Sequence, residues 1–411
     1  MEEELPHKIR RLSKDFNRDI SNDGAKRIMI PGKIFLECLL VWPDREMKYI
    51  TVFNWFMFIN VIIFEITHAC FVVPNIADYT TVIAVLVTVT ATFQFLVKFY
   101  VIVFKKSIIN QILLNIWREY WPLSVLSPKK VKRHSSTCKV KLRLILGCYT
   151  LAVIFAAIIT FAPFLTNTEL IVKSIFPFQW NKTYTYELVY TWQFVTAWYI
   201  TFLINSFDML MISVVIISAV QFAVLQNVVK NILTEKGERQ RRYLYNKDIS
   251  NQDMFKRWLE QQRMLIDTCN KLEEAFRIPI LHQLFCSITG LCASSVILKV
   301  DQSKFLEMST IALANMFQLF YYCFASNELT LQSEKTSDAV YFCNWQISQD
   351  MKFKKALVLV LQRCQKPLSL TAAGFIDLNF LSYIAVLRLC FSFYTLLTDL
   401  IVSKLEAAEL Q

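Results

Sequence analysis

The sequence predicts an all-α, polytopic membrane protein with seven transmembrane helices, a cytoplasmic amino terminus and an extracellular carboxyl terminus. Three observations predict this fold class. Apolar residues make up 55% of the 411 residues and charged residues only 19%, and the mean hydropathy is +0.38. Seven apolar runs have the length of about 20 residues that a helix needs to cross a bilayer core about 30 Å thick. Basic residues concentrate between particular runs and are scarce between the others.

The first two runs predict a tight outer hairpin. They cover 49–73 and 79–104 and are separated by Pro74, Asn75 and Asp78, residue types that favour turns. The remaining runs cover 142–165, 187–224, 278–298, 306–326 and 377–402. A weaker apolar stretch at 351–361 is too short to span and contains lysines, so it predicts a cytoplasmic helix.

The distribution of positive charge predicts the orientation of the chain. The first 48 residues contain ten Lys or Arg and nine Asp or Glu without an apolar segment, so we expect them to stay in the cytosol and not to form a cleaved signal peptide. The predicted inner segments hold 37 of the 44 basic residues. Since positive residues are retained on the cytoplasmic side, the net charge of +11 reports topology, and we expect no nucleic acid partner.

The outer loops and the dispersed cysteine and histidine residues bear on which classes of protein remain possible. Asn181-Lys182-Thr183 predicts glycosylation at Asn181 in the second outer loop. That loop contains no cysteine, so no extracellular disulfide framework is implied. The four histidines are dispersed, and the chain lacks an H-E-x-x-H motif, a C-x-x-C pair and a glycine-rich phosphate loop. We therefore expect no catalytic residues, no metal site and no cofactor, which excludes the common enzyme classes.

Three blocks near the carboxyl end resemble segments of insect odorant receptors: the segment after the sixth helix, the approach to the last helix, and the end of that helix. In this order, the blocks are NELTLQSEK at 327–335 with DAVY at 338–341 and Trp345; QKPLSLTA at 365–372 with Gly374 and Phe375; and Arg388 with SFYTLL at 392–397. Elsewhere the chain matches this family in span count, orientation and length.

The resemblance implies a non-selective channel for monovalent and divalent cations, gated by a small volatile hydrophobic ligand. The channel would lie among membrane lipid in the plasma membrane of a sensory neuron dendrite, as a heterotetramer with the family's shared co-receptor subunit. Co-receptors are longer and carry an insertion in the second inner loop, whereas the loop at 226–277 is only moderately long, so the resemblance implies the ligand-tuning subunit. We expect a cytoplasmic amino-terminal segment, six helices holding the ligand pocket, a cytoplasmic anchor segment, and a pore-lining helix with a short outer tail, at 1–48, 49–326, 327–376 and 377–411.

A seven-span receptor that is gustatory-like, or that signals through a cytosolic partner, is the alternative. The chain lacks the features of a G-protein-coupled receptor. Its predicted orientation is reversed, the second outer loop has no cysteine for a disulfide, and both the acidic-Arg-Tyr triplet and Asn-Pro-x-x-Tyr are missing. Recording ligand-evoked currents with the co-receptor present and G-protein signalling blocked separates the two functions.

The last predicted helix carries a polar stripe. Arg388, Ser392, Thr395 and Asp399 fall within an arc of about 60° on a helical wheel, in a helix otherwise rich in Leu, Phe, Ile and Val. Because polar groups facing lipid are unfavourable, the stripe either lines water or bonds to neighbouring helices. The family resemblance places a hydrophobic gate at Leu396 and Leu400. A narrow apolar ring blocks ions by dewetting, which suits leucine.

We expect the ligand pocket in the outer half of the bundle, since apolar ligands need an apolar and aromatic cavity with few polar groups. In the fourth span, Phe194, Trp198, Thr201 and Asn205 share one helical face, with Phe202 beside them. The other candidates are Ile83, Val87 and Thr90 in the second span, Phe155 and Ile159 in the third, and Met308, Ile311 and Asn315 in the sixth. Core packing is the alternative role for each of them.

The remaining charges predict structural contacts. Lys98 lies six residues from the inner end of the second run, close enough to snorkel to the membrane surface. Glu65, His68 and Asp208 lie too deep and should be paired or hydrated. Between 255 and 276, apolar residues recur every three to four positions, which predicts an amphipathic helix that extends the fifth span, seeks a partner and helps to anchor the tetramer against 338–361.

Overall fold

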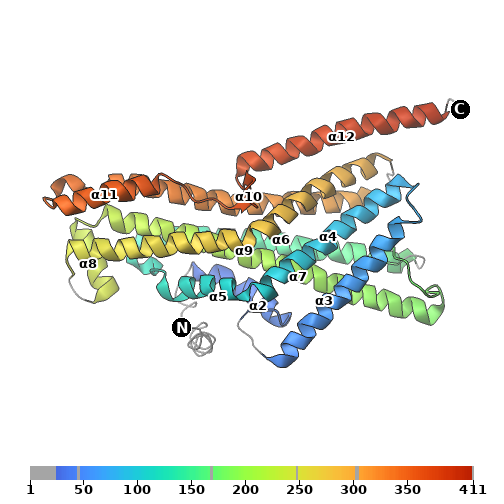
Figure 1. The fold of residues 1–411 in the computed structure, drawn as a ribbon, viewed down its shortest axis with the longest axis horizontal. Helices are drawn as coiled ribbons and strands as arrows, with labels where there is room; N and C mark the ends of the chain where they lie inside the picture. The colour runs from blue at the N-terminus through green and yellow to red at the C-terminus, as the bar shows by residue number, and fades with distance from the viewer. Residues whose placement is uncertain (1–24, 44–46, 167–169, 247–248, 301–304, 410–411) are drawn as a thin grey trace.

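The computed structural model describes residues 25–43, 47–166, 170–246, 249–300 and 305–409, which form an elongated bundle of long helices (Figure 1). In chain order, the elements are η1 (Lys26–Met29), α2 (Ile30–Cys38), α3 (Lys48–Ala69), η2 (Cys70–Val72), α4 (Tyr79–Phe104), α5 (Lys106–Leu114), η3 (Asn115–Glu119), η4 (Leu123–Val125), α6 (Pro128–Thr166), α7 (Thr183–Lys230), α8 (Glu235–Tyr245), α9 (Asn251–Val300), α10 (Phe305–Tyr341), η6 (Trp345–Ile347), α11 (Met351–Cys364), β1 (Thr371–Ala372), β2 (Ile376–Asp377) and α12 (Phe380–Glu409). A helix satisfies its backbone polar groups internally, which apolar segments require in lipid.

Each predicted apolar run lies largely within a single long helix of the described residues. Within the described residues, five helices are long and apolar enough to cross a membrane: α3 with η2, α4, α6, α7 and α9. In α12, the described side chains form an apolar stretch over Phe380–Leu396. Four helices continue well past the predicted spans, at the amino ends of α6 and α9 and the carboxyl ends of α7 and α10. The apolar runs therefore mark lipid-compatible sections of longer helices.

The predicted turn between the first two runs is present. The backbone N–H of Asn75 donates to the carbonyl of Val72 at 3.1 Å, and that of Asp78 donates to Asn75 at 3.0 Å. The α3–α4 hairpin runs obliquely to α7, with α4 packed against α9, and its turn lies at the same end of the molecule as the carboxyl end of α12 (Figure 1). The opposite end is formed by α8 and α11.

The helix α7 is the centre of the bundle. In its most apolar window, 89% of the residues are buried, against 22% in α3 and 17% in α6. A helix that is apolar on all sides packs well only when surrounded, whereas peripheral helices leave apolar side chains for lipid. The helices α4, α6, α9 and α10 all contact α7 and surround it.

The amino-terminal segment contributes to this core, although its sequence predicts only a charged cytoplasmic segment. Ile28, Met29 and Leu36 of η1 and α2 are fully buried, and Ser213 Oγ of α7 donates to the Ile28 carbonyl at 3.0 Å. A Cβ atom at Gly32 would lie 3.1 Å from the backbone nitrogen of Leu210. Glycine therefore permits the close approach of α2 to α7.

The amphipathic section of α9 is the predicted extension of the fifth span. Its apolar side chains are all buried: Phe255, Trp258, Leu265, Cys269, Leu272 and Phe276. Trp258 Nε1 donates to the Leu225 carbonyl of α7 at 2.9 Å, and the ring of Phe255 meets that of Phe353 in α11 edge-on at 4.9 Å. The partner of this face is therefore the chain's own α7 and α11, which agrees with the expected packing against 338–361.

A short hairpin, β1–β2, with two residues in each strand, joins α11 to α12 and is a small exception to the predicted all-α fold. Gly374 has a φ of +83°, a conformation that glycine adopts without strain. The backbone N–H of Thr371 donates to Glu273 Oε2 of α9 at 2.9 Å, and that of Ala373 donates to the Arg277 carbonyl at 3.2 Å. The hairpin thus attaches the start of α12 to α9.

Candidate functional site

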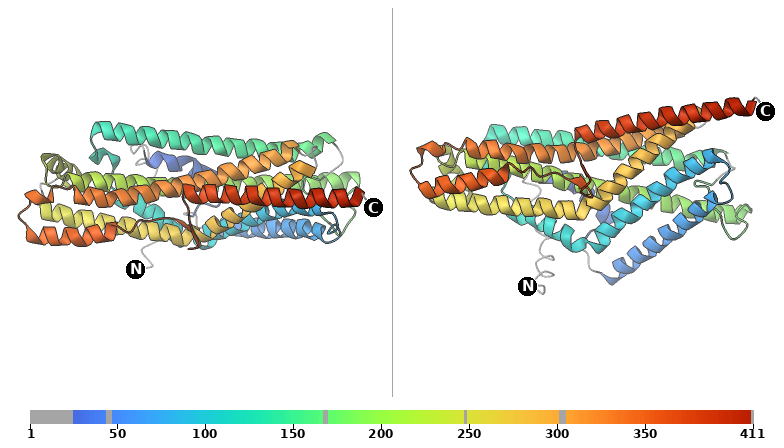
Figure 2. Two further views of the ribbon diagram at one scale, coloured as in Figure 1. Left: turned by 90° about the horizontal axis from the view of Figure 1, so that it is seen from above. Right: turned by 45° about the horizontal axis from the view of Figure 1, so that its top comes forward.

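The helix α12 lies along one side of the bundle, against α9 and α10 (Figure 2). Val386 and Cys390 are each 6% exposed and face the bundle. Arg388, Ser392 and Thr395 are exposed, on the opposite side of the helix, about 180° away at 100° per residue. The polar stripe of α12 therefore faces away from the chain's own helices.

The predicted gate residue Leu396 lies beside this stripe and is 58% exposed. Thr395 Oγ1 donates to the Ser392 carbonyl of the same helix at 2.8 Å. Asp399 and Leu400 belong to α12, but their side chains lie outside the described residues. The exposed surface of α12 thus combines hydroxyl groups, one guanidinium group and large apolar side chains.

The aromatic candidates of α7 form a continuous ladder against α6. The ring of Trp198 lies 5.9 Å from that of Phe194 and 5.5 Å from that of Phe202, measured between centroids. From α6, Phe161 lies 5.5 Å from Phe194, and Tyr149 lies 6.4 Å from Phe202. Phe155 and Ile159 of α6 are half-buried. The described residues include no hydrogen-bond partner for the Trp198 indole N–H, which leaves a donor within the ladder.

The polar candidates of α7 satisfy their hydrogen bonds within their own helix. Thr201 Oγ1 donates to the Ala197 carbonyl at 2.9 Å, and Asn205 Nδ2 donates to the Thr201 carbonyl at 2.8 Å. Asn205 also lines a crevice of about 10 Å³ between α6, α7 and α10, which is only large enough for a water molecule. A larger ligand there would require the helices to separate.

The other candidates lie around α9. Val87, Thr90 and Met308 are buried, whereas Ile83 and Ile311 are half-buried. The Thr90 carbonyl accepts from Cys286 Sγ of α9 at 3.3 Å. A Cβ atom at Gly290 would lie 2.6 Å from Asn315 Nδ2, so α9 and α10 touch where Asn315 lies. The structure thus places the candidates in two groups, the α6–α7 ladder and a set from α4 and α10 beside α9.

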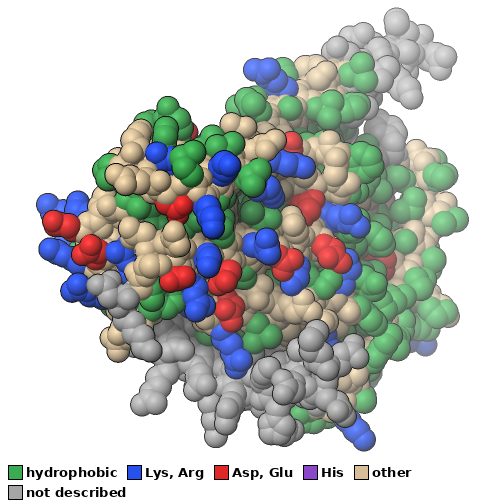
Figure 3. Space-filling view, turned by 60° about the vertical axis from the view of Figure 1, so that its left-hand side comes forward, with side chains coloured by type: hydrophobic (Ala, Val, Ile, Leu, Met, Phe, Trp, Pro, Cys, Tyr) green, Lys and Arg blue, Asp and Glu red, His purple; other side chains and the backbone are tan. Residues whose placement is uncertain are grey.

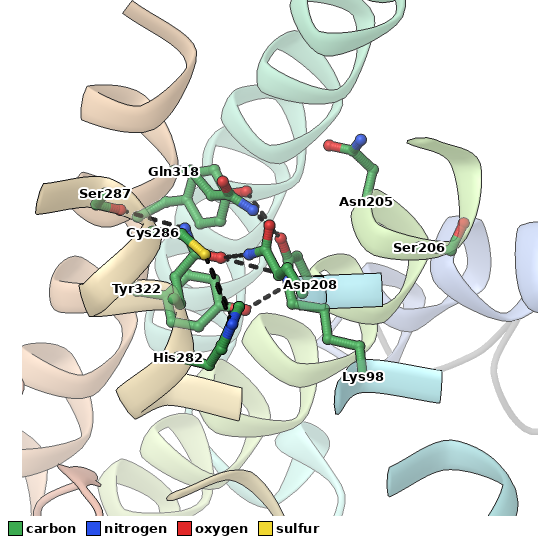
Figure 4. A network of polar contacts seen from close by, with 12 residues as sticks. Lys98, Asn205, Ser206, Asp208, His282, Cys286, Ser287, Gln318 and Tyr322 are labelled. Atoms are coloured by element: carbon green, nitrogen blue, oxygen red, sulfur yellow. Dashed lines mark hydrogen bonds and ion pairs between the residues drawn. The ribbon is translucent and has the colours of Figure 1, made fainter. Parts of the chain in front are cut away.

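Further along α7, a buried ion pair between α4 and α7 and its hydrogen-bond partners on α9 and α10 join four helices (Figure 4). Lys98 Nζ of α4 lies 2.5 Å from Asp208 Oδ1 of α7, and Lys98 is 0% exposed. Lys98 also donates to Gln283 Oε1 of α9 at 3.3 Å. From α10, Gln318 Nε2 and the Tyr321 hydroxyl donate to Asp208 Oδ2 at 2.7 and 3.3 Å, and the Tyr322 hydroxyl donates to Oδ1.

This network corrects the expected snorkelling of Lys98. Its ammonium group points into the bundle because Asp208 offers a charge partner that compensates for lost hydration. Asp208 is paired, as expected for its depth. The signal for this pair was present in the sequence as one lone cation and one lone anion in separate spans, but their relative depth becomes known only once the helices are packed.

His68 is also paired, with groups other than Glu65. Its Nδ1 lies 2.7 Å from the Lys173 carbonyl of the α6–α7 loop, and its Nε2 lies 2.5 Å from Thr88 Oγ1 of α4. Thus His68 ties that loop to the α3–α4 hairpin. Asn181, the predicted glycosylation site, is exposed in the same loop immediately before α7.

The long apolar helices, with a charge pair buried at their crossing, define a multi-pass membrane protein. The family described as 7tm Odorant receptor matches residues 75–391. The chain therefore belongs to the odorant receptor family and is a multi-pass protein of the plasma membrane.

Individual relatives match over shorter stretches. Odorant receptor 47b of Drosophila melanogaster is 23% identical over 264 residues, which cover 62% of this chain and 62% of that protein. Odorant receptor 2a of the same organism is 30% identical over 131 residues, 31% of this chain and 33% of that protein. An odorant receptor coreceptor of Ooceraea biroi is 26% identical over 149 residues, 36% of this chain and 31% of that protein. The chain thus spans less than two thirds of the length of these relatives.

The fold is similar to that of the insect olfactory receptor OR5 from Machilis hrabei, solved in complex with eugenol. The TM-score is 0.75 at 13% sequence identity, and the match covers 91% of this chain and 98% of that chain. The same receptor without eugenol in its description matches with a TM-score of 0.73 at 15% identity, over 90% of this chain and 96% of that chain. At these identities, the likeness shows the fold alone.

Proposed function

We propose that this chain is the odorant-binding, ligand-tuning subunit of a ligand-gated, non-selective cation channel. In this proposal the chain spans the membrane seven times, begins in the cytosol, ends outside, and works as a heterotetramer with the odorant receptor co-receptor. Membership of the odorant receptor family and the similarity to a coreceptor support the proposal.

The observation that carries the proposal is the orientation of α12. Its polar stripe of Arg388, Ser392 and Thr395 faces away from the chain's own bundle, in a helix that is otherwise apolar. Lipid solvates such groups poorly, so the stripe needs water or another subunit. One helix cannot enclose water, whereas symmetry-related helices around one axis can. Four α12 helices with their stripes facing one axis would line such a pore, with Leu396 and Leu400 as its apolar constriction.

We place the odorant at the ladder of Phe194, Trp198 and Phe202. Aromatic rings suit small apolar ligands, and the Trp198 indole N–H, which has no partner among the described residues, would orient an acceptor oxygen of the ligand. Opening of the gate requires the ligand to bind the open conformation more tightly than the closed one. The ion pair of Lys98 and Asp208 lies between the ladder and the inner helices and would keep four helices moving together.

The first test is Trp198→Ala, expressed with the co-receptor and recorded against a panel of volatile ligands. We expect the half-maximal ligand concentration to rise by about tenfold or more, since the substitution removes a large ring and its donor. Trp198→Phe removes only the donor and should raise the half-maximal concentration less.

Val195→Ala is the matched control, because Val195 lies on the same helix and is 57% exposed. Surface biotinylation checks that each variant reaches the membrane. An unchanged response of the Trp198→Ala variant, at normal surface expression, would remove the ladder from the proposed ligand site.

A further inference from the structure

A cavity of about 330 Å³ lies at the inner end of the bundle, far from the ladder. It is formed by the first turns of α6, the last turns of α7 and the middle of α10. Its lining residues are Leu126, Lys130, Arg133, His134, Thr137, Cys138, Lys141, Ala219, Val220, Ala223, Gln226, Asn227, Lys230, Glu328 and Gln332. The small side chains of Ala219 and Ala223, about one turn apart on α7, leave the space.

The charges that line this cavity are unbalanced. Lys141 is paired with Glu328 at 3.4 Å and lies over the ring of Phe324 at 5.5 Å. Lys130, Arg133 and Lys230 have no ion-pair partner among the described residues. Three unpaired cations therefore face a cavity that contains a single carboxylate, and that carboxylate is already engaged.

Burial and, after it, the neighbouring cations lower the pKa of two basic residues at this cavity. Burial, followed by Arg133, Lys130 and Lys141, lowers the pKa of His134, and only Glu328 raises it. Burial, followed by Lys230 and Lys236, lowers the pKa of Lys130. An anion in the cavity would relieve this repulsion and gain charge-assisted hydrogen bonds.

Polar side chains beside the cations are hydrogen-bonded to one another across the cavity. Gln226 Nε2 donates to the Gln332 carbonyl at 2.6 Å, and Gln332 Nε2 donates to Glu328 Oε1 at 3.2 Å, so α7 and α10 are joined across the cavity. In Figure 3, Lys and Arg side chains, interspersed with Asp and Glu, cover the end of the molecule formed by α8 and α11, and α6 begins at this same end (Figure 2). Lys141 is the last residue before the predicted span at 142–165, so in the proposed topology the cavity lies at the inner edge of the membrane.

We propose that this cavity binds a multiply charged phosphate group, carried either by an inner-leaflet lipid headgroup or by a soluble phosphorylated molecule. The cellular source rests on the proposed orientation, in which this end faces the cytosol. The phosphate oxygens contact Lys130, Arg133 and Lys230. The amides of Gln226 and Asn227 border the phosphate group. Occupancy would bridge α6 and α7 and stabilise the packing of the inner helices.

The test uses the purified full-length chain in nanodiscs. One arm measures binding of fluorescent inositol trisphosphate, and the other measures retention of phosphatidylinositol bisphosphate by native mass spectrometry, with phosphatidylcholine as the reference lipid. The triple variant Lys130→Gln, Arg133→Gln and Lys230→Gln should weaken binding by about tenfold or more. The matched control carries Lys129→Gln, Lys132→Gln and Lys139→Gln, which remove the same charge from positions of α6 that do not line the cavity, and it should change binding less than about twofold.

Binding in both arms that only the cavity variant weakens supports the proposal for either source. Retention of the lipid alone supports the proposal with a membrane headgroup, and binding of the soluble probe alone supports it with a free phosphorylated molecule. Absence of binding in both arms, or equal weakening by the control variant, would overturn the proposal.

Glu328→Gln provides a second measurement of opposite sign. It removes the carboxylate from the cavity and releases Lys141, so binding should tighten by about threefold. Weaker binding by the Glu328→Gln variant would overturn the proposal. These assays measure phosphate binding by the purified chain, whereas the proposed function is tested by ligand-gated current. A failure of one proposal can therefore be distinguished from a failure of the other.

Discussion

Replacing Asp208 by alanine should destabilise the folded protein by about 3–5 kcal/mol, because it leaves the ammonium group of Lys98 buried without a charge partner. Lys98 is 0% exposed, and its other bond is to Gln283. The measurement is thermal denaturation of the detergent-purified chain, together with the fraction that elutes as a single species.

Removing the cation of the pair should destabilise the protein less than removing the anion. In Lys98→Met, the Asp208 carboxylate keeps the donors from Gln318, Tyr321 and Tyr322, so its charge stays partly compensated. The double variant Lys98→Met with Asp208→Leu removes both charges and should recover most of the stability lost in Asp208→Ala, since an apolar pair often replaces a buried ion pair without loss.

Glu187→Ala is the control for this series, because it removes an exposed carboxylate from the same helix and should change stability by less than about 0.5 kcal/mol. A double variant as unstable as Asp208→Ala would show that the network contributes more than charge compensation. Wild-type stability of Asp208→Ala would refute the described pairing.

Leu396→Ser should produce a ligand-independent cation current. If Leu396 forms the apolar constriction, a hydroxyl at this position favours water in the closed gate, and the basal current should rise by about tenfold, the change that about 1.4 kcal/mol in the closed-to-open equilibrium produces. The measurement is whole-cell current without ligand, with the co-receptor expressed and each variant normalised to its surface expression.

Leu381→Ser is the matched control, since Leu381 is 77% exposed near the start of the same helix. A basal current raised equally by both substitutions would indicate a general disturbance of α12. If the Leu396→Ser variant shows no increase in basal current at normal surface expression, the constriction must lie elsewhere.

The sequence predicted those features of the fold that depend on local composition. The runs at 79–104 and 142–165 coincide with α4 and the apolar part of α6, because the length of an apolar run is set by the bilayer. The burial of Phe255 and Trp258 followed from helical periodicity. Contacts between distant segments could not be predicted in this way. The pairing of Lys98 with Asp208 depends on how α4 and α7 cross, and no local pattern contains that information.

Other features were missed because their signals resemble those of unstructured segments. The segment that holds α2 is short and lies beside a highly charged stretch, yet Met29 and Leu36 are completely buried against the bundle. The hairpin after α11 contains only two residues per strand, below the length that period-two alternation can reveal. Within the candidate site, aromatic spacing predicted the α7 ladder, whereas its neighbours on α6 depend on packing.

We propose above that this chain forms part of an ion channel that the odorant opens directly. The most direct measurement is current through excised patches that contain the chain and the co-receptor, in a bath free of GTP and other nucleotides. We expect a ligand identified in whole cells to evoke cation current in these patches, with the Trp198→Ala variant shifted to higher concentrations. Currents that occur in whole cells but disappear in every excised patch would contradict the claim and favour signalling through a cytosolic partner.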